Sequence, residues 1–244
     1  MSPEHRSGIS LIIPAHNEEK SIERCVMRCR SALGALGRPF EVIIAEDGST
    51  DDTCRIAEAI SKKFENVKFL HSDERLGKGG AIMRAAKAAK GEIIVVLDSD
   101  LATGLEHLPE LVGWIDKGYD IAMGSRLIAG SRVKRSMKRE LASRTYNKLV
   151  WAVLGSKLRD HQCGFKAFRK EKVSGLFDKV KETSWFWDTE FLVRAQNAGL
   201  TVKEFPITWH ESDETRIRFF KDSFRMGTSI LALKHRLWRE RRVQ

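Results

Sequence analysis

The chain has 244 residues, of which 42% are hydrophobic, so it suits one large globular domain or two small ones and excludes an intrinsically disordered protein. Its 43 Lys and Arg against 33 Asp and Glu give a net charge of +10, which indicates an anionic partner: nucleotide phosphates, nucleic acid or an anionic membrane surface. We expect no signal peptide, because the chain is polar up to Ser10, and no run approaches the roughly 18 apolar residues of a membrane span.

The first half of the chain alternates between strand and helix patterns. Apolar runs predict strands at residues 9–13, 40–45, 67–71, 92–97 and 120–123. Helical patterns between them cover residues 18–36, a segment from Asp51 or Asp52 to about residue 64, and residues 79–90 and 105–117. This rhythm predicts an α/β fold, with a mostly parallel sheet flanked by helices and joined by right-handed crossovers.

After Ser125 the alternation stops. Residues 131–139, rich in Lys and Arg, predict a basic, mobile loop. Helices are expected at residues 141–154, 188–196 and 219–242, and strands at 164–168 and 201–209, the last interrupted by Pro206. We therefore expect one domain over residues 1–210 and a basic amphipathic C-terminal extension over residues 211–244 that is not an independent domain.

Polar residues follow three of the predicted strands, at residues 14–18, 46–52 and 98–100. Because neighbouring parallel strands end at one edge of a sheet, we expect these segments to form one pocket. Glu18 and Asp47 can accept hydrogen bonds from a ribose or a base. Asp98 and Asp100 can hold Mg²⁺ or Mn²⁺, which would bind the diphosphate of a nucleotide. A turn or a helix start explains any one of these segments, but not all three together.

A glycine-rich segment opens the predicted helix at residues 79–90. Gly77, Gly79 and Gly80 surround Lys78, without the spacing of a Walker A loop. We expect these glycines to let the helix pack closely on the sheet, with Lys78 facing the nucleotide.

The chain has four cysteines, at positions 25, 29, 54 and 163. Cys25 and Cys29 lie four residues apart on a predicted helix, and no second pair follows at zinc-site spacing. We therefore expect reduced, buried thiols and no structural zinc.

Together these motifs resemble family 2 glycosyltransferases of the GT-A fold, over about residues 9–230. The resemblance rests on Ile-Pro-Ala-x-Asn-Glu, Glu-Asp-Gly-Ser-Thr-Asp, Gly-Lys-Gly-x-Ala and Gly-Glu-x-Ile-x-x-Leu-Asp-x-Asp. Gly-Ser-Arg at residues 124–126 and Gln-Cys-Gly-Phe-Lys at 162–166 resemble the dolichyl- or polyprenyl-phosphate hexose synthases. Within that group, these motifs of the second half look closer to dolichyl-phosphate glucosyltransferases than to the mannose enzymes.

The resemblance implies a nucleotide-sugar site at the strand ends. The implied nucleotide contacts are Pro14, Ala15, Glu18 and Asp47. Asp98 and Asp100, with Ser99 between them, would hold Mg²⁺ or Mn²⁺ on the donor diphosphate.

The implied phosphate contacts come from three arginines. Arg126 would lie near the phosphates of donor and acceptor, and Arg216 and Arg218 on a loop that closes over the site. The chain departs from the family at Ala102, where many mannose enzymes have Gln, and at His16, where the family has an aromatic residue.

The implied reaction is inverting transfer of a hexose from UDP-glucose or GDP-mannose to a polyprenyl or dolichyl phosphate. A lipid phosphate is already an anionic nucleophile and needs no strong general base, so Asp100 and Arg126 would act by alignment and charge. A glycan or other hydroxyl acceptor would need a base, for which Asp188 is the best candidate. The alternative role for Asp188 is to cap its helix.

The basic segments of the second half indicate where the protein acts. They predict peripheral association with the cytoplasmic face of an anionic membrane, alone or with a separate membrane protein. The alternative is a C-terminal helix that packs on the core. A nucleic-acid-binding module would explain the charge, but carboxylates at the strand ends repel a phosphate backbone. A nucleotidyltransferase would carry a glycine-rich loop after the first strand, where this chain has Pro14, Ala15 and His16.

Overall fold

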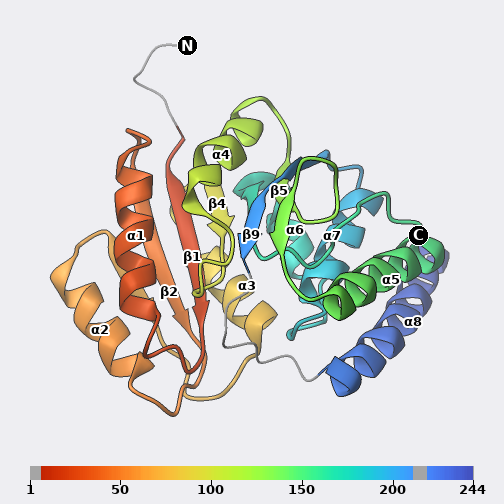
Figure 1. Ribbon diagram of the computed structural model, residues 1–244, viewed down its shortest axis with the longest axis horizontal. Coiled ribbons are helices and arrows are strands. Elements are labelled where there is room, and N and C mark those ends of the chain that lie inside the picture. Colours follow the sequence, from red (N-terminus) through yellow and green to blue (C-terminus); the bar gives the residue numbers. More distant parts are fainter. Residues whose placement is uncertain (1–6, 211–218, 244) are drawn as a thin grey trace.

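The computed structural model describes residues 7–210 and 219–243, and its centre is a seven-stranded sheet covered by helices (Figure 1). The strands of this sheet are β1 Ile9–Ala15, β2 Phe40–Glu46, β3 Val67–Leu70, β4 Ile93–Val96, β5 Ile121–Ser125, β7 Lys166–Arg169 and β8 Val202–Pro206. The helices are α1 Ile22–Gly34, α2 Thr53–Lys63, α3 Lys78–Ala88, α4 Leu108–Asp116, α5 Met137–Leu154, α6 Lys170–Phe177, α7 Trp187–Asn197 and α8 Phe219–Val243, with a short 3₁₀ turn at Leu105–His107. Two further strands, β6 Arg132–Lys134 and β9 Thr208–His210, form a small parallel sheet of their own.

The strand order is β3-β2-β1-β4-β7-β5-β8, and every pairing is parallel except those of β7 with β4 and β5. Helices α1, α2 and α4 lie on one face and α3, α6 and α7 on the other. The predicted α/β fold with a mostly parallel sheet is therefore confirmed. Because β7 runs against its neighbours, it begins at the edge where they end, so the segment before it meets the strand ends that carry the acidic motifs.

The strands form where continuous apolar runs can be buried on both faces, as a parallel sheet requires. In β1 and β4, Leu11, Ile12 and Val95 are fully buried. The predicted strands and helices of the first half are present, with ends that differ by one to a few residues.

The second half differs more from the prediction. The expected loop at residues 131–139 instead contains β6 and the first turn of α5, because Arg132 pairs with Thr208 and Arg135 forms an ion pair with Glu140. The single strand expected at residues 201–209 is two strands in different sheets, and β8 ends at Pro206. Helix α6 was not predicted.

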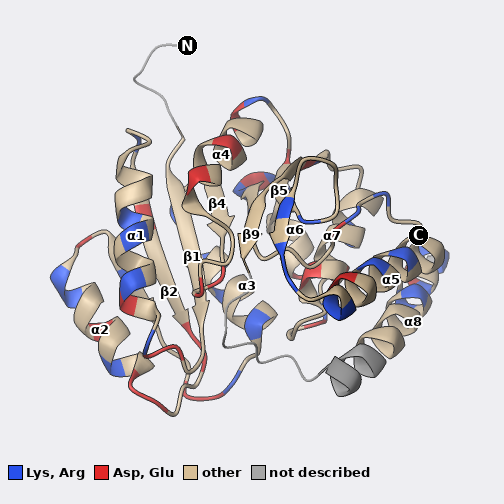
Figure 2. Ribbon diagram, in the orientation of Figure 1, with Lys and Arg blue, Asp and Glu red and all other residues tan. Residues whose placement is uncertain are grey.

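Helices α5, α7 and α8 enclose a second, smaller core. Its fully or nearly buried side chains are Val150, Leu154, Phe186, Val193, Ile230 and Leu233. Figure 1 shows α5 and α8 side by side, and Figure 2 shows Lys and Arg along both. The buried carboxylate of Glu190 binds Arg194 at 2.8 Å and Arg236 at 3.1 Å, and Arg194 also binds Glu240 at 2.8 Å. In residues 226–242, α8 thus packs on the domain, which was the alternative to a helix that lies only on a membrane.

No helix among the described residues is both long and apolar enough to cross a bilayer.

Candidate active site

The acidic motif lies directly beyond β4, at the edge where the parallel strands end. Asp98 is part-exposed, and its Oδ1 forms a 2.6 Å ion pair with Lys78 Nζ at the start of α3. Ser99 is buried and Asp100 is exposed. The carboxylate of Asp100 accepts a hydrogen bond from the backbone N–H of Ala102 at 3.0 Å.

Gly164, in the segment before β7, lies against the carboxylate of Asp98. A Cβ at Gly164 would lie 2.6 Å from Asp98 Cγ and closer still to Oδ2. Asp98 is thus confined by Lys78 on one side and by the backbone of Gly164 on the other. The register explains the contact, because Val96 of β4 pairs with Lys166 of β7 and the two chains continue in opposite directions.

Positively and negatively charged side chains surround the carboxylate of Asp98. Burial opposes the charge on Asp98, but Lys78, Lys166 and Arg126 outweigh it and lower the pKa of Asp98 below its usual range. Burial also opposes the charge on Lys78, whose pKa is nevertheless raised by Asp98, Asp188 and Asp100. Both groups are therefore charged at neutral pH.

The loop after Asp100 connects the acidic motif to the small sheet. Leu101 has a φ of 53°, a conformation that costs energy for a side chain of this kind. The backbone then runs against β9, where His210 N–H donates to Ala102 C=O at 2.9 Å and Thr103 forms a bridge with Trp209. Tertiary pairing thus holds a strained turn at the predicted metal-binding residues.

The loops after β1 and β2 carry the residues that the sequence predicts as nucleotide contacts. Pro14 is half-buried and Ala15 is buried, both at the end of β1. The carboxylate of Glu18 accepts a hydrogen bond from Ser21 Oγ at 2.6 Å, and its backbone N–H donates to Thr53 Oγ1 at 2.6 Å. The two loops are therefore linked to each other.

Asp47 is buried and holds a neighbouring loop. Its Oδ1 accepts from Leu76 N–H at 2.5 Å and its Oδ2 from Gly77 N–H at 3.0 Å. The backbone C=O of Asp47 lies 2.8 Å from His16 Nδ1. Asp47 thus anchors the segment that leads into Lys78.

The glycines around Lys78 do pack closely, but not on the sheet as predicted. A Cβ at Gly79 would lie 2.6 Å from Cδ1 of Trp187, at the start of α7. Gly77 has a φ of 84° and lies against the backbone of Thr183. The partner of this glycine-rich turn is therefore the segment that enters α7.

Arg126 follows β5 and is bound by a carboxylate that sequence reasoning missed. Its Nε and Nη2 donate to the two oxygens of Asp160, each at 2.8 Å, and its backbone N–H donates at 2.9 Å. Burial opposes the charge on Asp160, but Arg126 outweighs it and lowers the pKa of Asp160 to about 2. The guanidinium also lies 5.6 Å from the ring centre of Trp209, so the same residue faces β9.

Asp188 does not cap a helix, since α7 begins at Trp187 with Phe186 as its N-cap. Its Oδ1 instead accepts a hydrogen bond at 2.7 Å from Nζ of Lys166, and both side chains are almost fully buried. Lys166 also donates to the backbone C=O of Cys163. The sequence signal for this pair is Lys166 itself, a charged residue between apolar Phe165 and Ala167 at the start of β7. Of the predicted phosphate contacts, Arg216 and Arg218 lie outside the described residues.

Three comparisons place the chain among known proteins. It is 46% identical over 226 residues to the glycosyltransferase AglD of Haloferax volcanii, covering 91% of this chain and 36% of AglD, so it spans about a third of that relative. It is 31% identical over 240 residues to the dolichyl-phosphate beta-glucosyltransferase of Drosophila melanogaster, covering 92% of this chain and 74% of that protein. The human protein of the same name is 30% identical over 247 residues, with coverages of 93% and 75%.

The fold matches that of glucosyl-3-phosphoglycerate synthase from Mycobacterium tuberculosis, crystallised in complex with UDP. The TM-score is 0.67 at 22% sequence identity, covering 93% of this chain and 79% of that one. The sequence profile described as Glycosyl transferase family 2 matches residues 10–177, most of the central sheet. The chain therefore belongs to glycosyl transferase family 2.

Proposed function

We propose that this chain transfers glucose from UDP-glucose to a polyprenyl or dolichyl phosphate, with inversion at the anomeric carbon. The product would be a β-linked glucosyl phosphate lipid. The names of two relatives at 30–31% identity support glucose rather than mannose, and dolichyl phosphate as the acceptor.

The observation that carries this proposal is the ion pair between Asp188 and Lys166. A hydroxyl acceptor needs a carboxylate that is free to take its proton. Asp188 is instead buried and accepts a hydrogen bond from Lys166 Nζ at 2.7 Å. A lipid phosphate arrives already ionised and requires only alignment and positive charge, which Lys78 and Arg126 supply at this edge of the sheet.

The residues present fit a divalent cation such as Mg²⁺ or Mn²⁺. Asp98 and Asp100 offer only carboxylate oxygens, which these hard cations prefer. Oδ1 of Asp98 already pairs with the ammonium of Lys78, so a metal ion would have to share this carboxylate with Lys78 or displace the ammonium. A metal held by these two aspartates would neutralise the diphosphate that leaves with the nucleotide.

The remaining residues would hold the two substrates. Arg126 would bind the phosphates of donor and acceptor, and we keep Arg216 and Arg218 as proposed members of a closing loop. Ser99 would position the two aspartates on either side of it. The proposed nucleotide contacts are Pro14, Ala15, Glu18 and Asp47. Since both oxygens of Asp47 already accept backbone hydrogen bonds, its nucleoside contact would use a remaining lone pair.

We further propose that the protein binds the cytoplasmic face of a membrane from one side, alone or with a separate membrane protein. Large apolar side chains on α5 and α8 face solvent among the Lys and Arg residues of Figure 2. These side chains are Met137, Leu141, Leu149, Trp151, Leu231 and Trp238. Because α8 packs on α5 and α7, we keep the proposal that the C-terminal extension is part of one domain.

The test is a transfer assay with labelled donor and a matched pair of acceptors. The chain is incubated with Mn²⁺ or Mg²⁺, with UDP-glucose or GDP-mannose, and with a short polyprenyl phosphate or the same polyprenol without phosphate. We expect organic-soluble label only with UDP-glucose and the phosphate, and its loss on adding a chelator. Labelling of the polyprenol would refute the phosphate acceptor and would favour Asp188 as a general base for a hydroxyl acceptor.

A further inference from the structure

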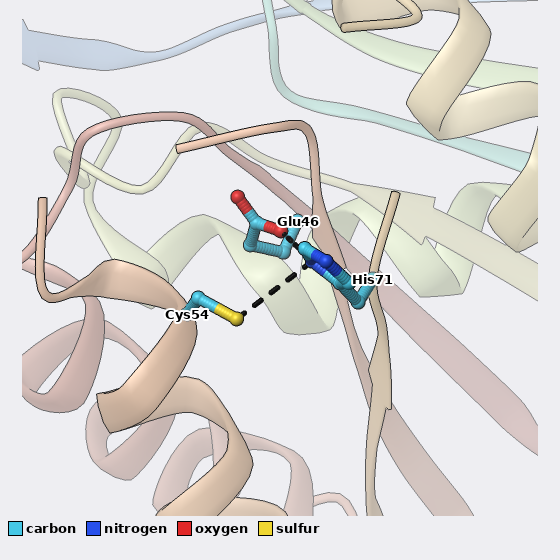
Figure 3. A group of neighbouring side chains, drawn as sticks. All are labelled: Glu46, Cys54 and His71. Carbon is cyan, nitrogen blue, oxygen red and sulfur yellow. Dashed lines mark hydrogen bonds and ion pairs between the residues drawn. The ribbon is translucent and has the colours of Figure 1, made fainter. Parts of the chain in front are cut away.

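A cluster of three metal-ligating side chains lies at the ends of β2 and β3, formed by residues that the proposed reaction does not use. Glu46 is the last residue of β2, Cys54 lies in the first turn of α2, and His71 follows β3 (Figure 3). We propose that Glu46, Cys54 and His71 form a second metal site, which binds a borderline-soft divalent cation such as Zn²⁺.

The geometry suits one cation between the three side chains. Each offers one ligand atom, and the three atoms lie within 4.8 Å of one another. A water molecule would be the fourth ligand of a tetrahedral ion. Tetrahedral zinc places neighbouring nitrogen, oxygen and sulfur ligands about 3.4–3.6 Å apart. Cys54 Sγ lies 3.7 Å from His71 Nδ1, which already matches this separation. His71 Nδ1 and Glu46 Oε2 are in closer contact and would have to move about 1 Å apart to admit the ion. The 37% exposed side chain of His71 permits this movement.

The ligand chemistry separates this cluster from the pair Asp98 and Asp100. One thiolate, one imidazole and one carboxylate form a donor set that zinc prefers and that Mg²⁺ does not. The two aspartates, in contrast, offer oxygen alone. The two sites should therefore select different cations.

A second layer of contacts orients the ligands. His71 Nε2 lies 3.0 Å from Oδ1 of Asp73, and a carboxylate on the outer nitrogen is the usual partner of a metal-bound histidine. It keeps the proton on Nε2 and leaves Nδ1 to the cation. The other oxygen of Glu46 accepts from Ser49 N–H at 2.6 Å, so Oε2 is turned toward the cluster. Phe69 stacks on the ring of His71, with centroids 5.8 Å apart.

A bound cation would stabilise one wall of the proposed nucleotide pocket. Glu46 precedes Asp47, which holds Leu76 and Gly77, and His71 begins the same loop. A metal ion bound to both Glu46 and His71 would fix the start of this loop, and Asp47 already holds its other end at Leu76 and Gly77. We therefore assign the site a structural role, with no direct part in the transfer. The proposal departs from the expectation of no structural zinc, which rested on the spacing of cysteine pairs alone.

The competing explanation is an imidazolium that pairs with two carboxylates and binds no metal, since His71 contacts both Glu46 and Asp73. The two explanations differ in what happens when metal is added. The cation would displace the proton on Nδ1 and the proton of the Cys54 thiol, releasing both to solvent, and would bond to the resulting thiolate. An ion pair would leave the thiol protonated.

The experiment is a cobalt titration of the whole chain, after treatment with a chelator and without nucleotide. Co²⁺ reports tetrahedral geometry through its visible absorption and a bond to thiolate through a charge-transfer band. We expect one tetrahedral, thiolate-bonded Co²⁺ per chain, displaced by Zn²⁺, with a melting temperature higher than that of the metal-free chain. Absence of the charge-transfer band at saturating Co²⁺ would overturn the proposal in favour of the ion pair.

Variants assign the ligands. Cys54→Ser should abolish the charge-transfer band and His71→Gln should weaken Co²⁺ binding at least 100-fold, whereas Asp73→Asn should weaken it about 10-fold. Asp100→Asn is the matched control, because it removes a proposed donor-site ligand and should leave the band unchanged. A band that survives in Cys54→Ser or disappears in Asp100→Asn would refute the assignment. Circular dichroism and native mass spectrometry show whether each variant is folded and how many ions it holds.

Discussion

Replacing Gly164 by alanine tests whether the position of Asp98 controls activity. The φ of Gly164 lies outside the left-handed region, so alanine can adopt the same backbone and only the new methyl group matters. That carbon would lie 2.6 Å from Asp98 Cγ. Carbon atoms normally approach to about 3.5 Å, so the carboxylate must move by about 1 Å. The movement also stretches its 2.6 Å ion pair with Lys78.

A displacement of about 1 Å at a reacting centre lowers the rate about 100-fold, which corresponds to about 2.7 kcal/mol of transition-state stabilisation. We therefore expect Gly164→Ala to lower kcat/KM for the proposed glucosyl transfer about 100-fold at saturating Mn²⁺. Overpacking costs about 1–3 kcal/mol of folding stability, so the chain should remain folded at the assay temperature.

Gly175→Ala is the matched control, since nothing lies within 4 Å of a Cβ added at this position of α6. It should leave kcat/KM unchanged and raise stability by up to about 1 kcal/mol, because alanine favours helix. Both variants are compared by steady-state kinetics and thermal melting. If Gly164→Ala retained wild-type kcat/KM with an unchanged melting temperature, the reasoning about Asp98 would be wrong.

Three further predictions concern metal binding, pH and the C-terminal helix. Asp100→Ala should abolish transfer and leave the melting temperature unchanged, because Asp100 is exposed and a proposed metal ligand; retained turnover would remove the metal hypothesis. Burial lowers the pKa of His161 from 6.5 to about 4, so below pH 6.5 the unfolded chain binds a proton that the folded chain does not. The unfolding free energy should thus fall by about 3 kcal/mol between pH 6.5 and 4 in urea denaturation, and His161→Gln should flatten that dependence. Leu233→Ala, at a fully buried site in α8, should lower the unfolding free energy by about 2–5 kcal/mol. Leu231→Ala, at a 63% exposed site, should lower it by under about 0.5 kcal/mol and should weaken sedimentation of the protein with anionic vesicles. Equal losses of unfolding free energy in the two variants would contradict the packing of α8.

Much of the first half was predictable because its signals are local. Apolar runs such as those of β1 and β4 predict strands wherever they fold, and polar residues after them predict a pocket once the strands are parallel. The family resemblance followed from the same short motifs, and the profile match over residues 10–177 agrees with it.

The second half was less predictable because its elements depend on distant partners. The short strand β6 forms through its pairing with β9, which is distant in the sequence. Its own basic composition has no strand pattern, and we therefore predicted a loop there. The run that became β7 indicates a strand but not its direction. Only that antiparallel direction brings Gly164 beside Asp98.

By itself, the sequence determined the fold class, the family and the acidic residues at the strand ends, because hydrophobic periodicity and short motifs are properties of neighbouring residues. The tertiary structure alone decided which charges meet: Lys166 with Asp188 and Arg126 with Asp160. The same holds for Cys54 and His71, which lie 17 positions apart with no motif between them. Such pairs depend on strand order, register and direction, which place side chains together across long stretches of chain and leave no local pattern in the sequence.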